Sequence, residues 1–499
     1  MNTMKNKIIA LFALVLFSNI VLAEVKLSGL FTNNMVLQQN SKVKVWGWAN
    51  PGEKISVTTS WSQSVKKTTA NSNGEWSVSL KTLDYKNDAQ SLKVSGENTI
   101  TISNILFGEV WFCSGQSNMD TTIKELGGWD SQWYSEDKRV IDASDYSNIR
   151  LFIVNKGLEK GLQKDVKGEW KKANAAAVHE FSATAWFFGL KLYQEIGVPI
   201  GLIESAWGGT GAEVWTPEQT VLDDEKLNFY KDAPNTHAYW PGQPGILYNN
   251  MVNPLFNFKI KGAIWYQGET NRKRNQAPVY PLLKKKMIKS WRKGWSNNFP
   301  FYLVQIAPYG YEDIYDGALL REAQLEVDNK VSKTQMVVTM DIGEVGDIHP
   351  KNKQDVGKRL ALWALKNEYG KEEIIASGPV FYKMIKTKTG VKLLFKNAEG
   401  LNADNATLQQ FEVAGSDKVF YPAEAKIVGT SVELITDVTN PEAVRFAFKS
   451  AVLAGLYNSA KLPASSFRTD DWEIAEVAYK KEEEIKKQIE KQAKDSNKK

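Results

Sequence analysis

The sequence predicts an α/β protein in which a parallel sheet, covered by helices on both faces, is flanked by two smaller β-domains. Strand and helix patterns alternate over residues 105–372, which argues for the parallel sheet. Short strands separated by turns fill residues 24–104 and 373–475. The chain has 499 residues, of which 42% are hydrophobic, as expected for a globular protein of two or three domains.

Residues 1–23 are typical of a secretory signal peptide. Two lysines precede an apolar run over residues 8–17, and Val21-Leu22-Ala23 places small residues at the −3 and −1 positions of a cleavage site. We therefore expect an exported protein, periplasmic or extracellular, with no stable membrane association after cleavage. The alternative, an N-terminal membrane anchor, is disfavoured because a full span needs about 20 apolar residues.

The first expected domain, residues 24–104, has strand patterns at 42–48, 55–59 and 76–80. Turns rich in asparagine, proline and glycine separate them, and this spacing suggests a small β-sandwich. Such a domain could bind sugar or support a catalytic domain, and we favour support.

The central domain, residues 105–372, combines strand patterns with amphipathic helical stretches. The strand patterns lie at residues 109–114, 149–155, 199–206, 260–266, 300–307 and 335–342, and the helical stretches at 181–195, 278–291, 318–329 and 353–369. An irregular, proline-containing loop at 216–246 carries His237, Tyr239 and Trp240. These three side chains either contact sugar or pack against one another on the surface.

Short strands return after residue 373, and they predict a second β-domain that ends near residue 475. Its strand patterns lie at 391–395, 411–415, 425–428 and 444–448. The last residues, 476–499, form a charged tail in which Glu482 and Lys486, like Glu483 and Lys487, are spaced to support an exposed helix. A solvated tail is favoured over a partner-binding segment.

A candidate nucleophile follows the first strand of the central domain. The apolar run 110–113 is broken at Gly115, and Ser117 comes at the turn. The carboxyl edge of an open α/β sheet is where ligands bind, although serine favours turns in any protein. Cys113 is the only cysteine, so it forms no internal disulfide, and we interpret it as a small buried hydrophobic residue.

A serine nucleophile needs a base, and the chain has only three histidines. His349 stands at the end of another apolar strand, with Asp347 two residues before it. Ser117, His349 and Asp347 therefore form a candidate catalytic triad. Asp341 is a more distant alternative for the acid, while His179 is interpreted as a loop or capping residue. Asp120 is expected to cap the helix that follows it.

Three motifs together resemble the sialate O-acetylesterase family, which belongs to the SGNH (GDSL-like) hydrolases. They are Gly-Gln-Ser-Asn-Met at 115–119, Trp-Tyr-Gln-Gly-Glu-Thr-Asn at 265–271 and Asp-Ile-His-Pro at 347–350. Further similar stretches lie at 207–210, 320–324 and 462–472. The general SGNH pattern has an aspartate three residues before the histidine. Here Gly346 holds that position and Asp347 comes one residue later, which resembles the esterase subfamily.

The resemblance implies a flavodoxin-like three-layer SGNH domain and a triad-based esterase. Ser117 would be the nucleophile, His349 the base and Asp347 the residue that orients it. Oxyanion donors would be the N–H groups of Ser117 and Gly209 and the side-chain amide of Gln267, where the wider clan has an asparagine. Loss of one such donor typically costs about 10²–10³ in rate.

Four further residues are candidates for substrate binding: Gln116, Asn118, Glu269 and Arg321. Glu269 is expected to orient Gln267, Arg272 or a sugar hydroxyl, and Arg321 either anchors the carboxylate of an acidic sugar or forms a structural salt bridge. We expect no cofactor and no metal site, because the sequence has no HExxH motif and no cluster of cysteine and histidine.

The resulting hypothesis is a secreted carbohydrate O-acetylesterase that acts on O-acetylated sialic acid. One alternative keeps the chemistry and changes the substrate to acetyl-xylan or another polysaccharide. A second alternative, a non-catalytic carbohydrate-binding protein, is disfavoured by the intact triad. Seventeen tryptophans suit a sugar-binding surface and a large β-rich core equally. The formal net charge of +6 is too small to suggest a nucleic-acid partner.

Overall fold

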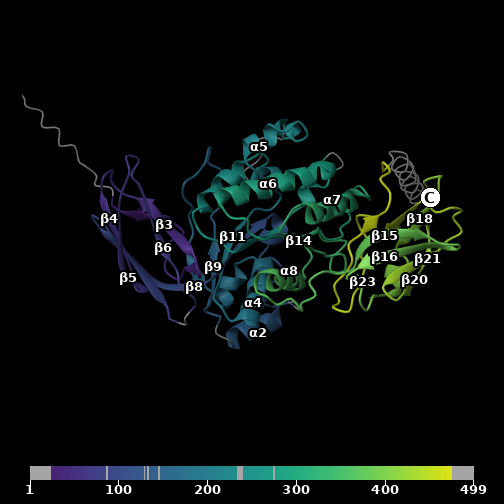
Figure 1. The fold of residues 1–499 in the computed structure, drawn as a ribbon, viewed down its shortest axis with the longest axis horizontal. Helices are drawn as coiled ribbons and strands as arrows, with labels where there is room; N and C mark the ends of the chain where they lie inside the picture. Colours follow the sequence, from purple (N-terminus) through teal and green to yellow (C-terminus); the bar gives the residue numbers. More distant parts are fainter. Residues whose placement is uncertain are drawn as a thin grey trace, which may run out of the picture.

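The computed structural model describes residues 24–474, with gaps at 86–87, 129, 132–133, 144–145, 233–239 and 274–275. The expected signal peptide, His237, Tyr239 and the charged tail therefore lie outside the described residues. A β-rich part, a central α/β part and a second β-rich part follow one another along the long axis of the molecule (Figure 1). The fold is mixed α/β, with a central mixed sheet and additional β-sandwich-like sheets.

The central sheet contains each of the strands that the sequence predicted for this domain. Its order is β10-β9-β11-β8-β12-β13-β14. The strands are β8 (Thr99–Gly115), β9 (Ile149–Ile153), β10 (Trp170–Lys172), β11 (Ile200–Ala206), β12 (Gly262–Tyr266), β13 (Phe301–Val304) and β14 (Thr334–Val337). All neighbouring pairs along this path are parallel except that β10 runs antiparallel to β9. Without β9 and β10, the chain order of these strands is 2-1-3-4-5, as in flavodoxin-like sheets.

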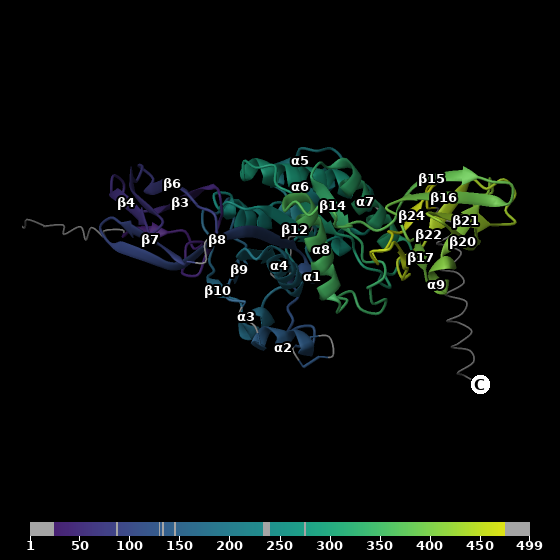
Figure 2. The same ribbon diagram turned by 60° about the horizontal axis from the view of Figure 1, so that its bottom comes forward.

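Helices cover both faces of this sheet, as predicted. On one face lie α4 (Ala183–Ile196) and α8 (Lys353–Glu368), and on the other lie α6 (Tyr280–Gly294) and α7 (Asp316–Lys330) (Figures 1 and 2). Close packing of α4 and α8 depends on Gly357, where an added Cβ would lie 2.6 Å from Cβ of Phe187. The short helices are α1 (Ser117–Asp120), α2 (Ser135–Ala143), α3 (Ala175–His179), α5 (Glu218–Leu222) and α9 (Asn405–Leu408).

Strand β8 joins the N-terminal β-domain to the central sheet. Its first part pairs with β7, residues 106–108 pair with β2, and the part from Glu109 onward pairs with β11 and β12. Every residue from Ile105 to Gly115 is buried. The expected domain boundary at residue 104 thus falls inside one continuous strand, and a single hydrophobic cluster extends from Val25 in the N-terminal domain to Met336 in β14.

The N-terminal domain contains the three strands that the sequence predicted. Its strands are β1 (Lys26–Leu27), β2 (Val36–Gln38), β3 (Lys42–Trp48), β4 (Lys54–Thr59), β5 (Ser62–Thr69), β6 (Glu75–Lys81) and β7 (Gln90–Ser95). Val43 and Val45 on β3 are buried on one face, and Lys44, Trp46 and Trp48 share the other face, on which Trp46 is also buried. Strand β5 was not predicted, because its side chains are exposed and show no alternation.

The C-terminal part contains two four-stranded sheets and a small two-stranded one. Its strands are β15 (Val380–Lys386), β16 (Gly390–Lys396), β17 (Asn402–Ala403), β18 (Phe411–Ala414), β19 (Phe420–Pro422), β20 (Glu424–Val428), β21 (Ser431–Ile435), β22 (Ala443–Phe446), β23 (Leu456–Tyr457) and β24 (Phe467–Arg468). They enclose a separate hydrophobic cluster. In the described part of the chain, no helix combines the length and hydrophobicity needed to cross a bilayer.

We expect Gly115→Ala to destabilise the protein, because Gly115 has φ +149° and an added Cβ would lie 2.1 Å from the backbone oxygen of Tyr266. The free energy of unfolding should fall by about 2 kcal/mol. Denaturant titration measures the change. The matched control is Gly346→Ala, where an added Cβ meets no described atom within 4 Å, and its unfolding midpoint should stay unchanged. Equal midpoints for both variants would contradict the expectation.

Candidate functional site

A cavity of about 600 Å³ opens at the carboxyl edge of the central sheet. Loops that follow β8, β9, β11, β12 and β14 supply its walls, together with Trp240 from the irregular loop. Its lining residues are Gln116, Ser117, Asp120, Lys156, Trp207, Gly208, Gly209, Trp240, Glu269, Thr270, Arg272, Ile348 and His349. Strand β8 lies where the direction of the crossover connections reverses, which is the expected ligand position in an open α/β sheet.

Ser117 is the first residue of α1 and lines the cavity. Its backbone N–H donates to no acceptor among the described residues, and the same holds for the N–H of Gly209. Gly209 has φ +73°, and an added Cβ there would lie 2.2 Å from Cδ1 of Trp240. The neighbouring Gly208 N–H instead donates to Asp120 at 3.2 Å. Two of the predicted oxyanion donors are therefore unpaired at this cavity.

His349 lines the same cavity as Ser117. Burial lowers the pKa of its imidazole below the usual 6.5, and the nearby cation of Lys353 lowers it further, while Asp347 and Glu125 act in the opposite direction. One carboxylate oxygen of Asp347 accepts the backbone N–H of His349 at 2.8 Å. Among the described residues the imidazole makes no hydrogen bond with Asp347, so the orienting role of Asp347 stays a prediction.

The alternative acid, Asp341, is paired elsewhere. Both of its carboxylate oxygens accept hydrogen bonds from Arg359, at 2.8 and 2.6 Å. This two-point pairing with a guanidinium is a strong structural contact, and Asp341 does not line the cavity. Asp347 is the better candidate for the triad acid.

The prediction of Gln267 as an oxyanion donor is wrong. Its side chain is fully buried, and its amide nitrogen donates to the backbone oxygen of Thr210 at 3.2 Å and to Oδ1 of Asn271 at 2.7 Å. Its amide oxygen accepts from the hydroxyl of Tyr280. With both N–H groups donated inside the protein, none remains for an oxyanion.

Arg321 and Asn118 do not bind substrate as predicted. Arg321 is fully buried, and its guanidinium donates to Ser466 Oγ and to the backbone oxygens of Lys449 and Ser450 in the C-terminal part. Burial lowers its pKa to about 10. Arg321 therefore joins two parts of the fold. Asn118 is also fully buried and is absent from the cavity wall.

Asn118 instead connects three loops through its side chain. Its amide nitrogen donates to Glu269 at 2.6 Å and to the backbone oxygen of Ile348 at 3.0 Å. Its amide oxygen accepts from the buried ammonium of Lys353, which also donates to the backbone oxygen of Pro350 at 2.7 Å. The loops that carry Ser117, Glu269 and His349 are thereby held together behind the cavity.

This buried network perturbs the pKa of each charged group in it. Burial lowers the pKa of Lys353 to about 7, although Glu269, Asp347 and Glu344 favour its charged form. Burial likewise raises the pKa of Glu269. The second carboxyl oxygen of Glu269 is buried, without a partner among the described residues, and Glu269 lines the cavity. Strong perturbation of this kind is common at functional sites.

Gln116 lines the cavity and was predicted to bind substrate. Its amide oxygen accepts the N–H groups of Gly268 and Thr270, at 3.2 and 3.4 Å, which fixes the orientation of the amide. Its amide nitrogen donates to no acceptor among the described residues. Gln116 therefore presents an available donor next to Ser117.

The comparisons with known proteins agree with this architecture. A family model described as carbohydrate esterase, sialic acid-specific acetylesterase, matches residues 108–366. The chain belongs to this family. Sialate O-acetylesterase of Mus musculus is 30% identical over 409 residues, covering 70% of this chain and 74% of that protein. The counterpart of Rattus norvegicus is 29% identical and covers 87% and 92%, respectively.

A solved structure supports the same conclusion for the fold. The crystal structure of a carbohydrate acetylesterase from Xanthomonas citri has a TM-score of 0.80 and 33% sequence identity, and it covers 90% of this chain and 100% of that one. As a member of the acetylesterase family, the protein is a carboxylic ester hydrolase. The described residues contain no group of three or more His, Cys, Asp or Glu side chains arranged to hold a metal ion.

Sequence reasoning missed several residues of the esterase cavity. Asp120 does not cap a following helix; its carboxylate accepts from Lys156 at 2.8 Å and from Gly208. Burial raises the pKa of Asp120. Lys156 follows β9 and Arg272 directly follows the motif at 265–271, so both lie near carboxyl strand ends, but that position alone does not tell which side chains reach the cavity. His179 lies outside the cavity, at the end of α3.

We expect Lys353→Met to raise the pKa of His349, because a nearby cation disfavours the imidazolium. An NMR titration of the imidazole measures this directly, and a chain with three histidines is simple to assign. Lys351→Met is the matched control, because Lys351 is in the same loop and its charge is absent from those that act on His349. An unchanged pKa in Lys353→Met would contradict the electrostatic link.

Proposed function

We propose that this esterase removes acetyl groups from the hydroxyls of sialic acid through an acyl-enzyme on Ser117. The observation that carries the proposal is that Ser117 and His349 line one cavity in which the N–H groups of Ser117 and Gly209 are unpaired. Relatives named sialate O-acetylesterase, at 29–30% identity, support the choice of substrate.

In the first half of the reaction, Ser117 Oγ attacks the acetyl carbonyl while the neutral imidazole of His349 takes its proton. The lowered pKa of His349 favours the neutral imidazole, which is the form that accepts this proton. The sugar hydroxyl then leaves with the proton that His349 returns. In the second half, His349 activates water, which releases acetate and regenerates Ser117.

The oxyanion is stabilised by fixed hydrogen-bond donors. We assign the N–H groups of Ser117 and Gly209 to this role, with Gln116 in the place that Gln267 cannot take. The N–H groups of Gly268 and Thr270 bind the amide oxygen of Gln116. The NH₂ group of Gln116 therefore points away from these two N–H groups and is free to donate to an oxyanion. Asp347 supports His349 through the backbone and through its charge.

Arg272 takes the role that the sequence suggested for Arg321. Its guanidinium lines the cavity, donates to the backbone oxygen of Glu269 at 3.0 Å and lies 4.5 Å from the ring centroid of Tyr311. Arginine binds carboxylates in a two-point geometry, which suits the carboxylate of sialic acid. The other cation of the cavity, Lys156, is neutralised by Asp120.

The proposal also includes an SGNH fold for the central domain and export of the protein. The SGNH assignment is supported by the strand order of the central sheet and by the position of Ser117 after β8. Export to the periplasm or the exterior is supported by the leader-like pattern of residues 1–23.

A neutral acetylated polysaccharide such as acetyl-xylan is the second candidate substrate. Trp207 and Trp240 both line the cavity, and Trp240 is 62% exposed. Exposed aromatic rings stack on the apolar faces of neutral sugars and need no carboxylate. The catalytic steps would be the same for this substrate.

Ser117→Ala should abolish acetate release while the protein stays folded, because the acyl-enzyme cannot form. Acetate release is measured by the purified mature chain from O-acetylated sialic acid and from acetylated xylan, side by side, with circular dichroism as the folding control. Faster Ser117-dependent release from the sialic acid supports the first substrate. Turnover that persists in Ser117→Ala would remove Ser117 from its assigned role.

Arg272→Gln should separate the two candidate substrates. We expect kcat/KM for O-acetylated sialic acid to fall at least about tenfold, because a charge-assisted carboxylate contact is lost, while kcat/KM for acetylated xylan changes little. Lys273→Gln is the matched control, since Lys273 is the exposed neighbour and does not line the cavity. Equal losses of kcat/KM on both substrates would show that Arg272 does not bind the carboxylate of sialic acid.

A further inference from the structure

A chain of hollows continues from the esterase cavity to the N-terminal β-domain. The cavity shares Lys156 with a second hollow of about 710 Å³, which is lined mainly by the loop of residues 155–167. That hollow shares Gln163 and Lys164 with a third one of about 640 Å³. Each volume falls within the range of about 300–1,000 Å³ typical of small-molecule sites, so together they far exceed the need of one sugar.

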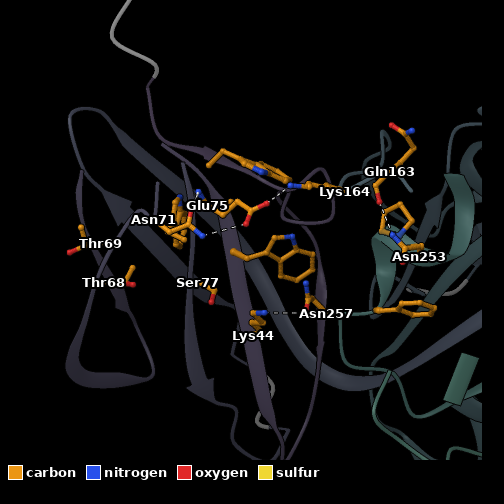
Figure 3. A pocket seen from close by; sticks show the side chains of 16 residues that line it. Lys44, Thr68, Thr69, Asn71, Glu75, Ser77, Gln163, Lys164, Asn253 and Asn257 are labelled. Carbon is orange, nitrogen blue, oxygen red and sulfur yellow. Dashed lines mark hydrogen bonds and ion pairs between the residues drawn. The ribbon is translucent and has the colours of Figure 1, made fainter. Parts of the chain in front are cut away.

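The third hollow lies between two parts of the fold. Figure 3 shows Lys44, Asn71, Glu75 and Ser77 of the β-domain on one side and residues of the central part on the other. Lys164 pairs with Glu75 at 2.5 Å, and Lys44 donates to Asn257 at 3.2 Å (Figure 3). The first contact neutralises Glu75 and Lys164, so the ammonium of Lys44, side-chain amides, hydroxyls and aromatic rings remain to bind a ligand.

The lining of the third hollow has the chemistry that recognises sugars. Trp46 and Trp48 lie on the face of β3 that is turned away from the buried valines, and Phe256 faces them from the central part. Ser77 is exposed and directly opposite Trp46 in the β3–β6 register.

The loop that connects the hollows is held in place at several points. The side chain of Asn250 exchanges hydrogen bonds with the backbone of Glu159, at 3.0 and 2.8 Å. Asn253 donates to the backbone oxygen of Gln163 at 2.8 Å. Asp165 accepts from the N–H of Gly29 at 2.9 Å, which ties the loop to the β-domain. The groove is therefore preformed, and binding it does not require a loop to be ordered.

We propose that this groove binds the glycan chain that carries the acetyl ester. The acetylated sugar occupies the cavity at Ser117, and the following sugars extend along residues 155–167 to the hollow beside Trp46, Trp48 and Ser77. The natural substrate is then an oligosaccharide or polysaccharide and not a free monosaccharide. This inference rests on the proposed function and adds the N-terminal β-domain to substrate binding.

The first test compares short and long substrates with matched chemistry. Values of kcat/KM are measured for free O-acetylated N-acetylneuraminic acid against its sialyl-oligosaccharide, and for acetylated xylobiose against acetylated xylohexaose. In the wild type, the longer member of at least one pair should be preferred about tenfold, equal to about 1.4 kcal/mol. The preferred pair identifies the source of the glycan. A ratio near one in both pairs would overturn the proposal.

Variants in the third hollow then locate the effect. Ser77→Trp fills the hollow and Trp48→Ala removes an aromatic wall, so both should reduce the length preference to about twofold or less while hydrolysis of 4-nitrophenyl acetate stays unchanged. Ser64→Trp is the matched control, because Ser64 is exposed on β5 and outside the hollow. A length preference that survives Ser77→Trp would place chain binding elsewhere and overturn the proposal.

Binding without turnover separates this inference from the proposed function. Calorimetry with the Ser117→Ala variant measures the affinity for the non-acetylated forms of the two longer oligosaccharides, with and without Ser77→Trp. If the Ser117→Ala variant binds either oligosaccharide and Ser77→Trp abolishes that binding, the groove is supported. This holds even if the wild type hydrolyses neither sugar ester. The absence of binding of both refutes the groove even if Ser117 proves to be the nucleophile.

Discussion

The geometry of the active site depends on the side chain of one buried asparagine. Asn118 is fixed behind the cavity by the carboxylate of Glu269, the backbone of Ile348 and the ammonium of Lys353. Because it directly follows Ser117, and Ile348 directly precedes His349, the same amide fixes the backbone beside both of these cavity residues. Within this buried polar network, the ammonium of Lys353 donates to both Asn118 and the backbone of Pro350, which favours one arrangement of the loops.

Burial in this network also creates a controlled electrostatic environment. Lys353 acts on His349, while Glu269 keeps one carboxyl oxygen unpaired at the cavity wall. The protein therefore places ionisable groups where water cannot screen them, and small charges there have large effects.

The sheet and its covering helices were predictable from the sequence because they carry strong periodic signals. Apolar runs identified β8, β9 and β11 to β14, whereas the short strand β10 and the exposed, unpatterned strand β5 were not predicted. Among the site residues, Ser117 and His349 followed from their positions at strand ends. Gln267, Arg321 and Asn118 belong to the same motifs but face the interior, and only tertiary packing decides whether a polar side chain points into a cavity or away from it.

The same limit explains the residues that sequence reasoning overlooked. Lys156 and Arg272 carry no motif of their own, and their importance arises from the loops that meet at the cavity. The hollow between the β-domain and the central part combines residues from positions 44 to 257. Such a surface forms only when the chain folds, so no local sequence pattern predicts it.

Sharing β8 between the N-terminal domain and the catalytic sheet makes the two parts one cooperative unit. Their common hydrophobic cluster has no internal boundary at which one half could open alone, whereas the C-terminal strands enclose a cluster of their own. In amide hydrogen exchange, the N-terminal strands and the strand before Ser117 should open in one event. The strand that leads to Ser117 thus shares the rigidity of the N-terminal domain, while the C-terminal part is free to open as a separate foldon.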